Sequence, residues 1–320
     1  MVSPLYKCIP KIHARVCECQ HSHNVKSGPH GKGRRSCRWP WIRSISLTAG
    51  GETMPLATVN GLEIHYRVTG EGRPVVLVHG FTGNSRNWAL TVPALRPYFR
   101  LVSPDLRGHG LSAKPTQPED YLLEAMAEDV VQLIHHLGLH GCHLVGHSMG
   151  GMIAQMVALS QPQLLKSLVL VDTSAEPPSI LRVQERAKLV QIAREKGMEA
   201  VWEAQLNLNP QAEELRAQPE FLQVWKEQFL LTSREAYIYC AQSIASRRPL
   251  LEELRSLTLP VLIVCGDKDE PFLEPSIRMH RAIPGSRLHI IPNCGHTPQI
   301  ERPQQFNEAL LAFLREIEGL

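Results

Sequence analysis

Continuous apolar runs of strand length recur along the chain from residue 54 onward. PVVLVHG at 74–80 is one such run, and this pattern is typical of strands that are covered on both faces. The other runs lie at 99–105, 143–147, 166–172, 260–267 and 286–292. Ahead of them, TVNGLEIHYRVTG at 58–70 alternates apolar and polar positions around an Asn-Gly turn, which predicts a hairpin of two strands. The pattern therefore predicts eight strands.

Helical periodicity fills most of the intervals between these runs, at 119–138, 149–161, 274–283 and 303–318. Alternating buried strands and helices predict an α/β fold, with a mostly parallel eight-stranded sheet and helices on both faces. Residues 175–256 break the alternation, because they hold several helical stretches and no convincing strand. We expect a core of 54–174 and 257–320, with 175–256 as a helical cap over the carboxyl ends of the strands, where open α/β sheets bind ligands.

The first 53 residues differ from the rest of the chain. They carry nine Lys and Arg against two Asp and Glu. They show neither helical nor strand periodicity, and they lack the apolar segment of a secretory signal. The alternation of Cys17, Cys19, His21 and His23 does not have the spacing of a folded zinc module. Codons for AGGETM at 49–54 can spell a ribosome-binding sequence ahead of Met54. We therefore hypothesise that Met54 is the natural start of a bacterial protein, and that 1–53 is a disordered leader or non-native extension.

Composition excludes several classes of protein. The chain is 43% hydrophobic and 20% charged, with a net charge of +3 that comes from the first 53 residues. Residues 54–320 are mildly acidic, so no basic face for nucleic acid is expected, and no apolar run is long enough to span a bilayer. Four widely spaced cysteines follow residue 54, in mostly apolar runs: Cys142, Cys240, Cys265 and Cys294. Reduced thiols in a cytoplasmic monomer or homodimer are expected.

The stretch GHSMG at 146–150 is the G-x-S-x-G pattern between a predicted buried strand and a predicted helix. Glycines two residues before and after Ser148 let the strand and the helix pass closely, with the serine oxygen exposed at a strained turn. The amide end of the following helix favours negative charge there. The placement predicts that Ser148 is a nucleophile, and a small serine filling a tight turn is the lesser alternative.

A serine nucleophile needs a base, and His296 occupies a loop bounded by Gly and Pro, NCGHTPQIERP, between the last strand and the last helix. His109 is its main competitor. Core or surface roles are expected for the histidines within strands or near a helix end, namely His135, His136, His140, His143 and His289.

The acid that orients the histidine should lie between Ser148 and His296, at the end of the penultimate strand. VLIVCGDKDEPF offers Asp267 and Asp269. Asp267 follows a glycine directly and suits a turn, whereas Asp269 is better placed to reach the histidine loop, so we favour Asp269. Asp172, at the end of the preceding strand, remains a third candidate.

An oxyanion hole needs two backbone N–H groups near the nucleophile. One should come from Met149, directly after Ser148, and the other from Phe81, in the loop HGFTGN after the strand at 74–80.

Together, VVLVHGFTGN, SPDLRGHGLS, LVGHSMGGMIA, VLIVCGDKDEP and NCGHTPQIERP resemble the α/β-hydrolase superfamily over essentially all of 54–320. The resemblance implies Ser148 as nucleophile, His296 as base and acid, and Asp269 as its partner, in the superfamily's Ser…Asp…His order. It also implies that Asp105, Arg107, Gly108 and His109 shape a loop beside the active site. The serine, and the absence of an HGGG run, make the chain most similar to small bacterial esterases, enol-lactonases, carbon–carbon bond hydrolases and haloperoxidase-like proteins.

We therefore expect a serine esterase that cleaves small to medium hydrophobic esters or lactones, without metal or organic cofactor. Phe81, His109, Trp202 and Trp225 are the predicted substrate-binding residues, although holding the cap helices together is the simpler role for each cap aromatic. Two alternatives stay open. One is a hydrolase of carbon–carbon bonds or amides with the same three residues, and the other is a receptor-like protein that mainly binds a ligand.

Overall fold

A computed structural model describes residues 53–208, 213, 216–217 and 219–320. Its centre is one eight-stranded sheet with the order β1-β2-β4-β3-β5-β6-β7-β8. The strands are β1 (Leu56–Val59), β2 (Leu62–Thr69), β3 (Arg73–Val78), β4 (Phe99–Pro104), β5 (Cys142–His147), β6 (Leu165–Val171), β7 (Val261–Gly266) and β8 (Arg287–Ile291). The predictions for 1–53 lie outside the described residues except at Thr53, which forms a bridge to Val68.

The predicted fold class is confirmed. β1 and β2 form an antiparallel hairpin, β2 pairs with β4 antiparallel, and the pairs from β4 to β8 are all parallel. The hairpin turns at Asn60 and Gly61, which both have positive φ angles, 50° and 74°. That conformation suits Asn and Gly, and it is the reason that the dipeptide predicted the turn.

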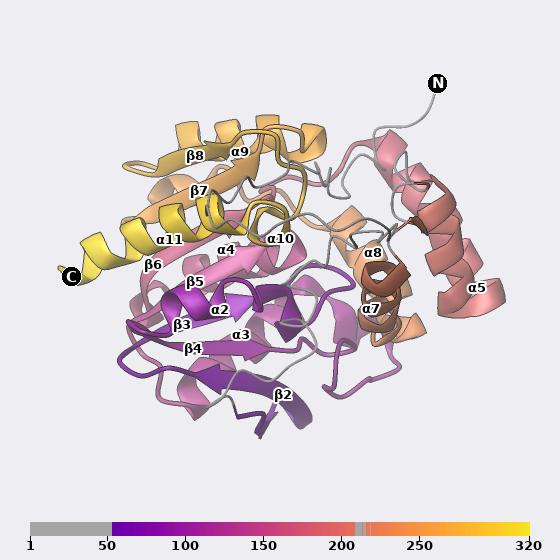
Figure 1. Cartoon of the computed structure of the whole chain (residues 1–320), viewed down its shortest axis with the longest axis horizontal. Helices are drawn as coiled ribbons and strands as arrows, with labels where there is room; N and C mark the ends of the chain where they lie inside the picture. The colour runs from indigo at the N-terminus through magenta and orange to yellow at the C-terminus, as the bar shows by residue number, and fades with distance from the viewer. Residues whose placement is uncertain (1–52, 209–212, 214–215, 218) are drawn as a thin grey trace, which may run out of the picture.

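Helices cover both faces of the sheet (Figure 1). They are α2 (Val92–Leu95), α3 (Leu123–His136), α4 (Met149–Ser160), α9 (Glu270–Ala282), α10 (Pro298–Glu301) and α11 (Pro303–Glu318). Successive side chains of β3 point to opposite faces, so Val76 and Val78 join the cluster with α3 and α4, whereas Val75 and Leu77 join the cluster with α2 and α11. Both clusters are buried, which explains the uninterrupted apolar runs of the sequence.

Between β6 and β7 the chain forms α5 (Ile180–Leu208), α7 (Pro219–Leu230) and α8 (Arg234–Ser246). Figure 1 shows these three helices together at the right of the view, beyond the carboxyl end of β4. An apolar cluster with several aromatic side chains, including Trp202, Phe229 and Tyr237, joins them. α5 bends at Gly197, whose φ of 81° only glycine adopts at little cost. No helix among the described residues combines the length and the apolar character that crossing a membrane requires.

Candidate active site

Ser148 lies at the sharp turn between β5 and α4, with φ 52° and ψ −114°. A positive φ is strained for a serine, at a cost of about 1–3 kcal/mol, and the surrounding contacts hold it in place. The Ser148 N–H donates to the Val171 carbonyl over 2.8 Å, and the Thr173 hydroxyl donates to the Ser148 carbonyl over 2.7 Å. The main chain of the turn is therefore fixed, which leaves the Ser148 hydroxyl for other contacts.

The glycines on either side of Ser148 allow this turn. A Cβ on Gly146 would lie 2.3 Å from the Gly150 carbonyl oxygen, and a Cβ on Gly150 would lie 2.4 Å from the Val78 carbonyl oxygen. Both contacts are with backbone, which cannot swing aside. The close passage of strand and helix that the sequence predicted is therefore present.

The predicted base and acid lie beside Ser148. His296 Nε2 is 2.9 Å from Ser148 Oγ, and His296 Nδ1 is 2.7 Å from Asp269 Oδ2. Asp269 is fully buried, and it lies between β7 and α9 as the N-cap residue of α9. Residues far apart in the sequence thus form one hydrogen-bonded chain at the carboxyl ends of β5, β7 and β8, where the sheet and the cap meet.

The His296 loop is held from several directions. Glu301 accepts hydrogen bonds from the N–H groups of Gly295, 2.7 Å, and Thr297, 2.9 Å. The ring of Phe272 stacks on the imidazole, with 4.8 Å between centroids. His147 Nε2–H donates to the His296 carbonyl over 2.7 Å. Burial, and after it the charge of His296, lower the pKa of His147 to about 3, so His147 stays a neutral donor. These contacts fix the direction of the imidazole.

Asp267 stabilises a turn, which is the role that its position directly after a glycine suggested. Its Oδ1 accepts the Cys294 N–H over 3.1 Å, and its Oδ2 is 3.4 Å from Lys268 Nζ. The side chain is 28% exposed, whereas that of Asp269 has no exposed surface. Asp269, and not Asp267, contacts the histidine.

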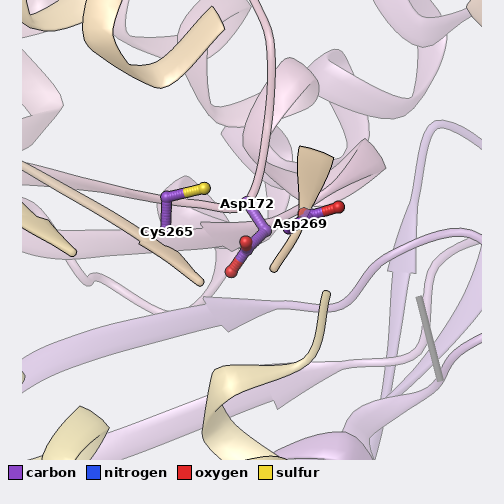
Figure 2. A group of neighbouring side chains, drawn as sticks. All are labelled: Asp172, Cys265 and Asp269. Atoms are coloured by element: carbon purple, nitrogen blue, oxygen red, sulfur yellow. The ribbon is translucent and has the colours of Figure 1, made fainter. Parts of the chain in front are cut away.

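Asp172, the third candidate, lies behind Asp269. Figure 2 shows its side chain between those of Cys265 and Asp269, and the three groups each offer an atom within 4.8 Å of the others. Asp172 Oδ1 accepts the Gly266 N–H over 3.0 Å. Burial, and after it the negative charge of Asp269, raise the pKa of Asp172 well above its usual value.

A protonated Asp172 is therefore a neutral neighbour of the Asp269 carboxylate. Burial likewise raises the pKa of Cys265, which keeps its thiol protonated. A neutral acid and a thiol beside one carboxylate do not form the anionic oxygen set that hard divalent cations prefer. We interpret the cluster as a support for Asp269.

The two amides predicted for an oxyanion hole flank the Ser148 turn. Met149 is the first residue of α4, where an N–H has no partner within the helix. Phe81 follows β3, and a Cβ on its neighbour Gly80 would lie 3.1 Å from Ser148 Cβ. In the described part of the chain, neither the Met149 nor the Phe81 N–H has a hydrogen-bond acceptor. Both remain available to an oxygen bound at Ser148.

Two cavities, of about 400 Å³ and 230 Å³, meet at Phe81, Ser148 and His296. Trp202 and Trp225, two of the predicted substrate-binding residues, line the smaller one. They also contact each other, with 4.9 Å between ring centroids, so they hold the cap together as well.

His109 differs from its predicted place, because it lines neither cavity. It has no exposed surface and lies behind Phe81, with 6.5 Å between the two rings. Its Nδ1–H donates to the Arg107 carbonyl over 2.9 Å, and burial lowers its pKa to about 3. Its loop is held by the Asp105 carboxylate, which accepts the Ser85 N–H, and by an ion pair of Arg107 with Asp129. His109 therefore supports the loop that carries it, and that loop does not bring it to either cavity.

Sequence reasoning did not include the charged residues of the larger cavity. Its lining contains four arginines and one glutamate: Arg182, Arg186, Arg247, Arg278 and Glu176. Arg182 and Arg186 are four residues apart on α5, a spacing that places them on one helix face. That spacing was the one available signal, but it does not show whether the face meets solvent or a cavity.

Comparison with known proteins agrees with this geometry. Residues 73–303 match the family described as the alpha/beta hydrolase fold. The chain belongs to this family. It is similar to the structure of a thermophilic esterase from Thermogutta terrifontis, with 30% identity, a TM-score of 0.73, and coverage of 83% of this chain and 99% of that one. The enol-lactonase from Burkholderia xenovorans gives 29% identity and a TM-score of 0.73, with coverage of 81% and 99%.

A curated relative is 28% identical over 265 residues, which cover 79% of this chain and 88% of the relative. It is the 2-hydroxy-6-oxo-6-(2'-aminophenyl)hexa-2,4-dienoic acid hydrolase of Metapseudomonas resinovorans. This α/β hydrolase therefore resembles hydrolases that are named for different substrates. The comparisons support a hydrolase and leave its substrate open.

Proposed function

We propose that this α/β hydrolase cleaves carboxylic esters or lactones through an acyl-enzyme formed on Ser148. One observation carries the proposal: the His296 ring bridges Ser148 Oγ, at 2.9 Å, and the buried Asp269 carboxylate, at 2.7 Å. A serine hydroxyl becomes a useful nucleophile only when a base can take its proton, and an imidazole oriented by a carboxylate supplies that base.

In the proposed first step, Ser148 Oγ attacks the carbonyl carbon as His296 Nε2 takes the hydroxyl proton. Asp269 accepts the Nδ1–H, which fixes the tautomer and stabilises the imidazolium. His296 then returns the proton to the leaving alcohol. In the second step His296 takes a proton from water, and the oxygen of this water attacks the acyl carbon. His296 then gives the proton to Ser148 Oγ as the acid is released.

The negative charge on the attacked oxygen would be met by the N–H groups of Phe81 and Met149. Such a donor strengthens its bond as charge develops, and losing one typically slows a serine hydrolase by about a hundredfold or more. The α4 N-terminus adds a partial positive charge at the same place.

Similarity to an esterase and an enol-lactonase supports an ester or lactone as substrate. The combined volume of the two cavities suits an ester with a small to medium acyl group and alcohol. Similarity to a carbon–carbon bond hydrolase supports a second candidate, in which the same residues cleave a vinylogous diketone.

The test is an activity profile across 4-nitrophenyl esters of increasing acyl length, lactones of graded ring size, and one vinylogous diketone. The wild type is compared with Ser148→Ala and with Ser160→Ala, a matched change at an exposed position on the same helix. We expect ester or lactone turnover that Ser148→Ala abolishes and Ser160→Ala retains. Turnover of the diketone alone would favour the second candidate, and full ester activity in Ser148→Ala would refute the nucleophile.

A further inference from the structure

The larger cavity beside Ser148 has an unusual charge for a site expected to hold a neutral ester. Its lining includes four arginines and one glutamate. Ser148 and His296 line the same cavity. Glu176 is already engaged by Arg278, with 2.8 Å between Oε2 and the guanidinium nitrogen. The lining also contains the Arg186 and Arg247 guanidinium groups, which bring positive charge to this cavity.

Arg182 and Arg186 are held against aromatic rings that flank the proposed catalytic groups. The Arg182 guanidinium lies 5.2 Å from the centre of the Phe272 ring, which is itself stacked on His296. The Arg186 guanidinium lies 5.2 Å from the centre of the Phe81 ring. Contacts of this kind fix the direction of an arginine without neutralising it. The Arg186 guanidinium is thus held, still charged, in a cavity whose lining includes Ser148.

The hydrogen bonds of Arg186 and Arg247 go to neutral groups in the described part of the chain, and the charge of the Glu176 carboxylate also acts on Arg247. Arg186 donates to the Tyr237 hydroxyl over 3.4 Å, and burial raises the pKa of Tyr237, so this hydroxyl is uncharged. Arg247 is 7% exposed and donates to the carbonyls of Ile244 and Glu176.

Burial, and after it the positive charge of Arg182, lower the pKa of Arg247 to about 10. Guanidinium groups that repel one another in a partly buried site are stabilised when an anion enters between them.

The smaller cavity has fewer charged side chains in its lining, where Arg186 is accompanied by polar residues such as Asn87 and Gln205. Its walls include apolar and aromatic side chains of the cap: Leu189, Trp202, Leu206, Trp225 and Phe229. Phe81, Arg186, Ser148 and His296 line both cavities. The Ser148 hydroxyl therefore lies between a cationic chamber and an aromatic chamber.

We propose, on the basis of the acyl-transfer function above, that the substrate is an ester or lactone with a carboxylate on one side of the scissile carbonyl and an apolar group on the other. The carboxylate enters the cationic chamber and binds Arg186 and Arg247, with Arg182 beside them. The apolar group enters the aromatic chamber. This assignment differs from the hydrophobic ester that the sequence indicated, because the sequence did not show which way the α5 arginines face.

Two matched pairs of esters test the proposal. The first compares 4-nitrophenyl hydrogen glutarate with 4-nitrophenyl valerate, which places the charge on the acyl side. The second compares the phenylacetate ester of glycolic acid with propyl phenylacetate, which places the charge on the alcohol side. A charge-assisted bidentate contact predicts that kcat/KM favours the carboxylate member of one pair by about tenfold or more.

The variants are Arg186→Gln, Arg182→Gln and, as control, Arg194→Gln, which lies on an exposed turn of α5 and lines neither cavity. We expect Arg186→Gln to lower the preference for the carboxylate member by about tenfold or more, and Arg182→Gln to lower it less. Arg194→Gln should leave the preference as in the wild type. Because the neutral ester is the internal reference, a general loss of activity does not change this ratio.

As a second measurement, glutarate should inhibit neutral-ester hydrolysis by the wild type competitively, and 1,5-pentanediol should not. This measurement applies even if Arg186→Gln fails to fold. Ser148-dependent hydrolysis without a carboxylate preference in either pair, and without inhibition by glutarate, would overturn this inference and leave the proposed function intact. Absence of any Ser148-dependent hydrolysis would instead overturn the proposed function.

Discussion

Replacing Asp269 by Asn tests the assignment of the orienting acid. The Asp269 side chain has no exposed surface, and its Oδ2 accepts the His296 Nδ1–H over 2.7 Å. Asn keeps the shape, but its amide can donate to Nδ1, which favours the tautomer that carries its proton on Nε2. That tautomer cannot take the proton of Ser148. The change also removes the charge that stabilises the imidazolium.

Loss of both effects predicts that kcat falls by about a thousand- to ten-thousandfold, or about 4–5.5 kcal/mol of barrier. Asp267→Asn is the matched control two residues away. Its Oδ1 accepts the Cys294 N–H, which an asparagine oxygen can also do, so we expect kcat within about threefold of the wild type.

Steady-state kinetics on the best ester of the panel measures both variants, with circular dichroism to show that each is folded. KM should change far less than kcat, because Asp269 lines neither cavity. An inactive Asp267→Asn beside an active Asp269→Asn would refute the assignment.

Three further changes probe the surroundings of the site. Asp172→Asn should keep kcat/KM within about fivefold, because an amide can replace a protonated acid beside Asp269, and a hundredfold loss would mean that Asp172 acts as an anion. Gly150→Ala should lower the free energy of unfolding by about 2 kcal/mol or more in urea titrations, because its Cβ would lie 2.4 Å from the Val78 carbonyl oxygen, and wild-type stability would contradict this close packing. His109 has its pKa lowered to about 3, so the unfolded chain takes up a proton as the pH falls below 6.5 and the folded chain does not. Between pH 7 and pH 5 this group should cost the wild type about 2 kcal/mol of stability, and His109→Asn should lose that part of the slope, whereas an unchanged slope would contradict a neutral buried His109.

Strand positions were predictable because both faces of this sheet are covered. The run at 74–80 corresponds to β3 at Arg73–Val78, and the bounds of the other runs also lie close to those of their strands. Helix starts were less accurate. Helical periodicity predicted 274–283, but α9 begins at Glu270, ahead of Pro275 inside the helix. The predicted helix at 119–138 begins as a 3-10 turn at Pro118–Tyr121 and restarts at Leu123, because Leu122 is extended.

The order of the candidate residues along the chain was enough to predict which of them meet at the site, but the sequence did not show where their side chains point. Ser148, Asp269 and His296 follow strands whose carboxyl ends lie together, so topology alone brings them near one another. His109 and Arg186 are two residues whose side-chain directions the sequence did not predict. Each follows an ordinary local pattern, and only the packing of the β4 loop and of α5 turns the first into the core and the second toward Ser148. Those contacts join residues far apart in the sequence.

Trapping the acyl-enzyme tests the central proposal most directly. The protein is mixed with its best 4-nitrophenyl ester, quenched in acid within the first turnovers, and analysed by intact mass and peptide mapping. We expect an increase in mass equal to the acyl group, located at Ser148, together with a burst of one 4-nitrophenolate per chain. An acyl group on any other residue, or turnover that proceeds with no covalent adduct, would contradict the mechanism.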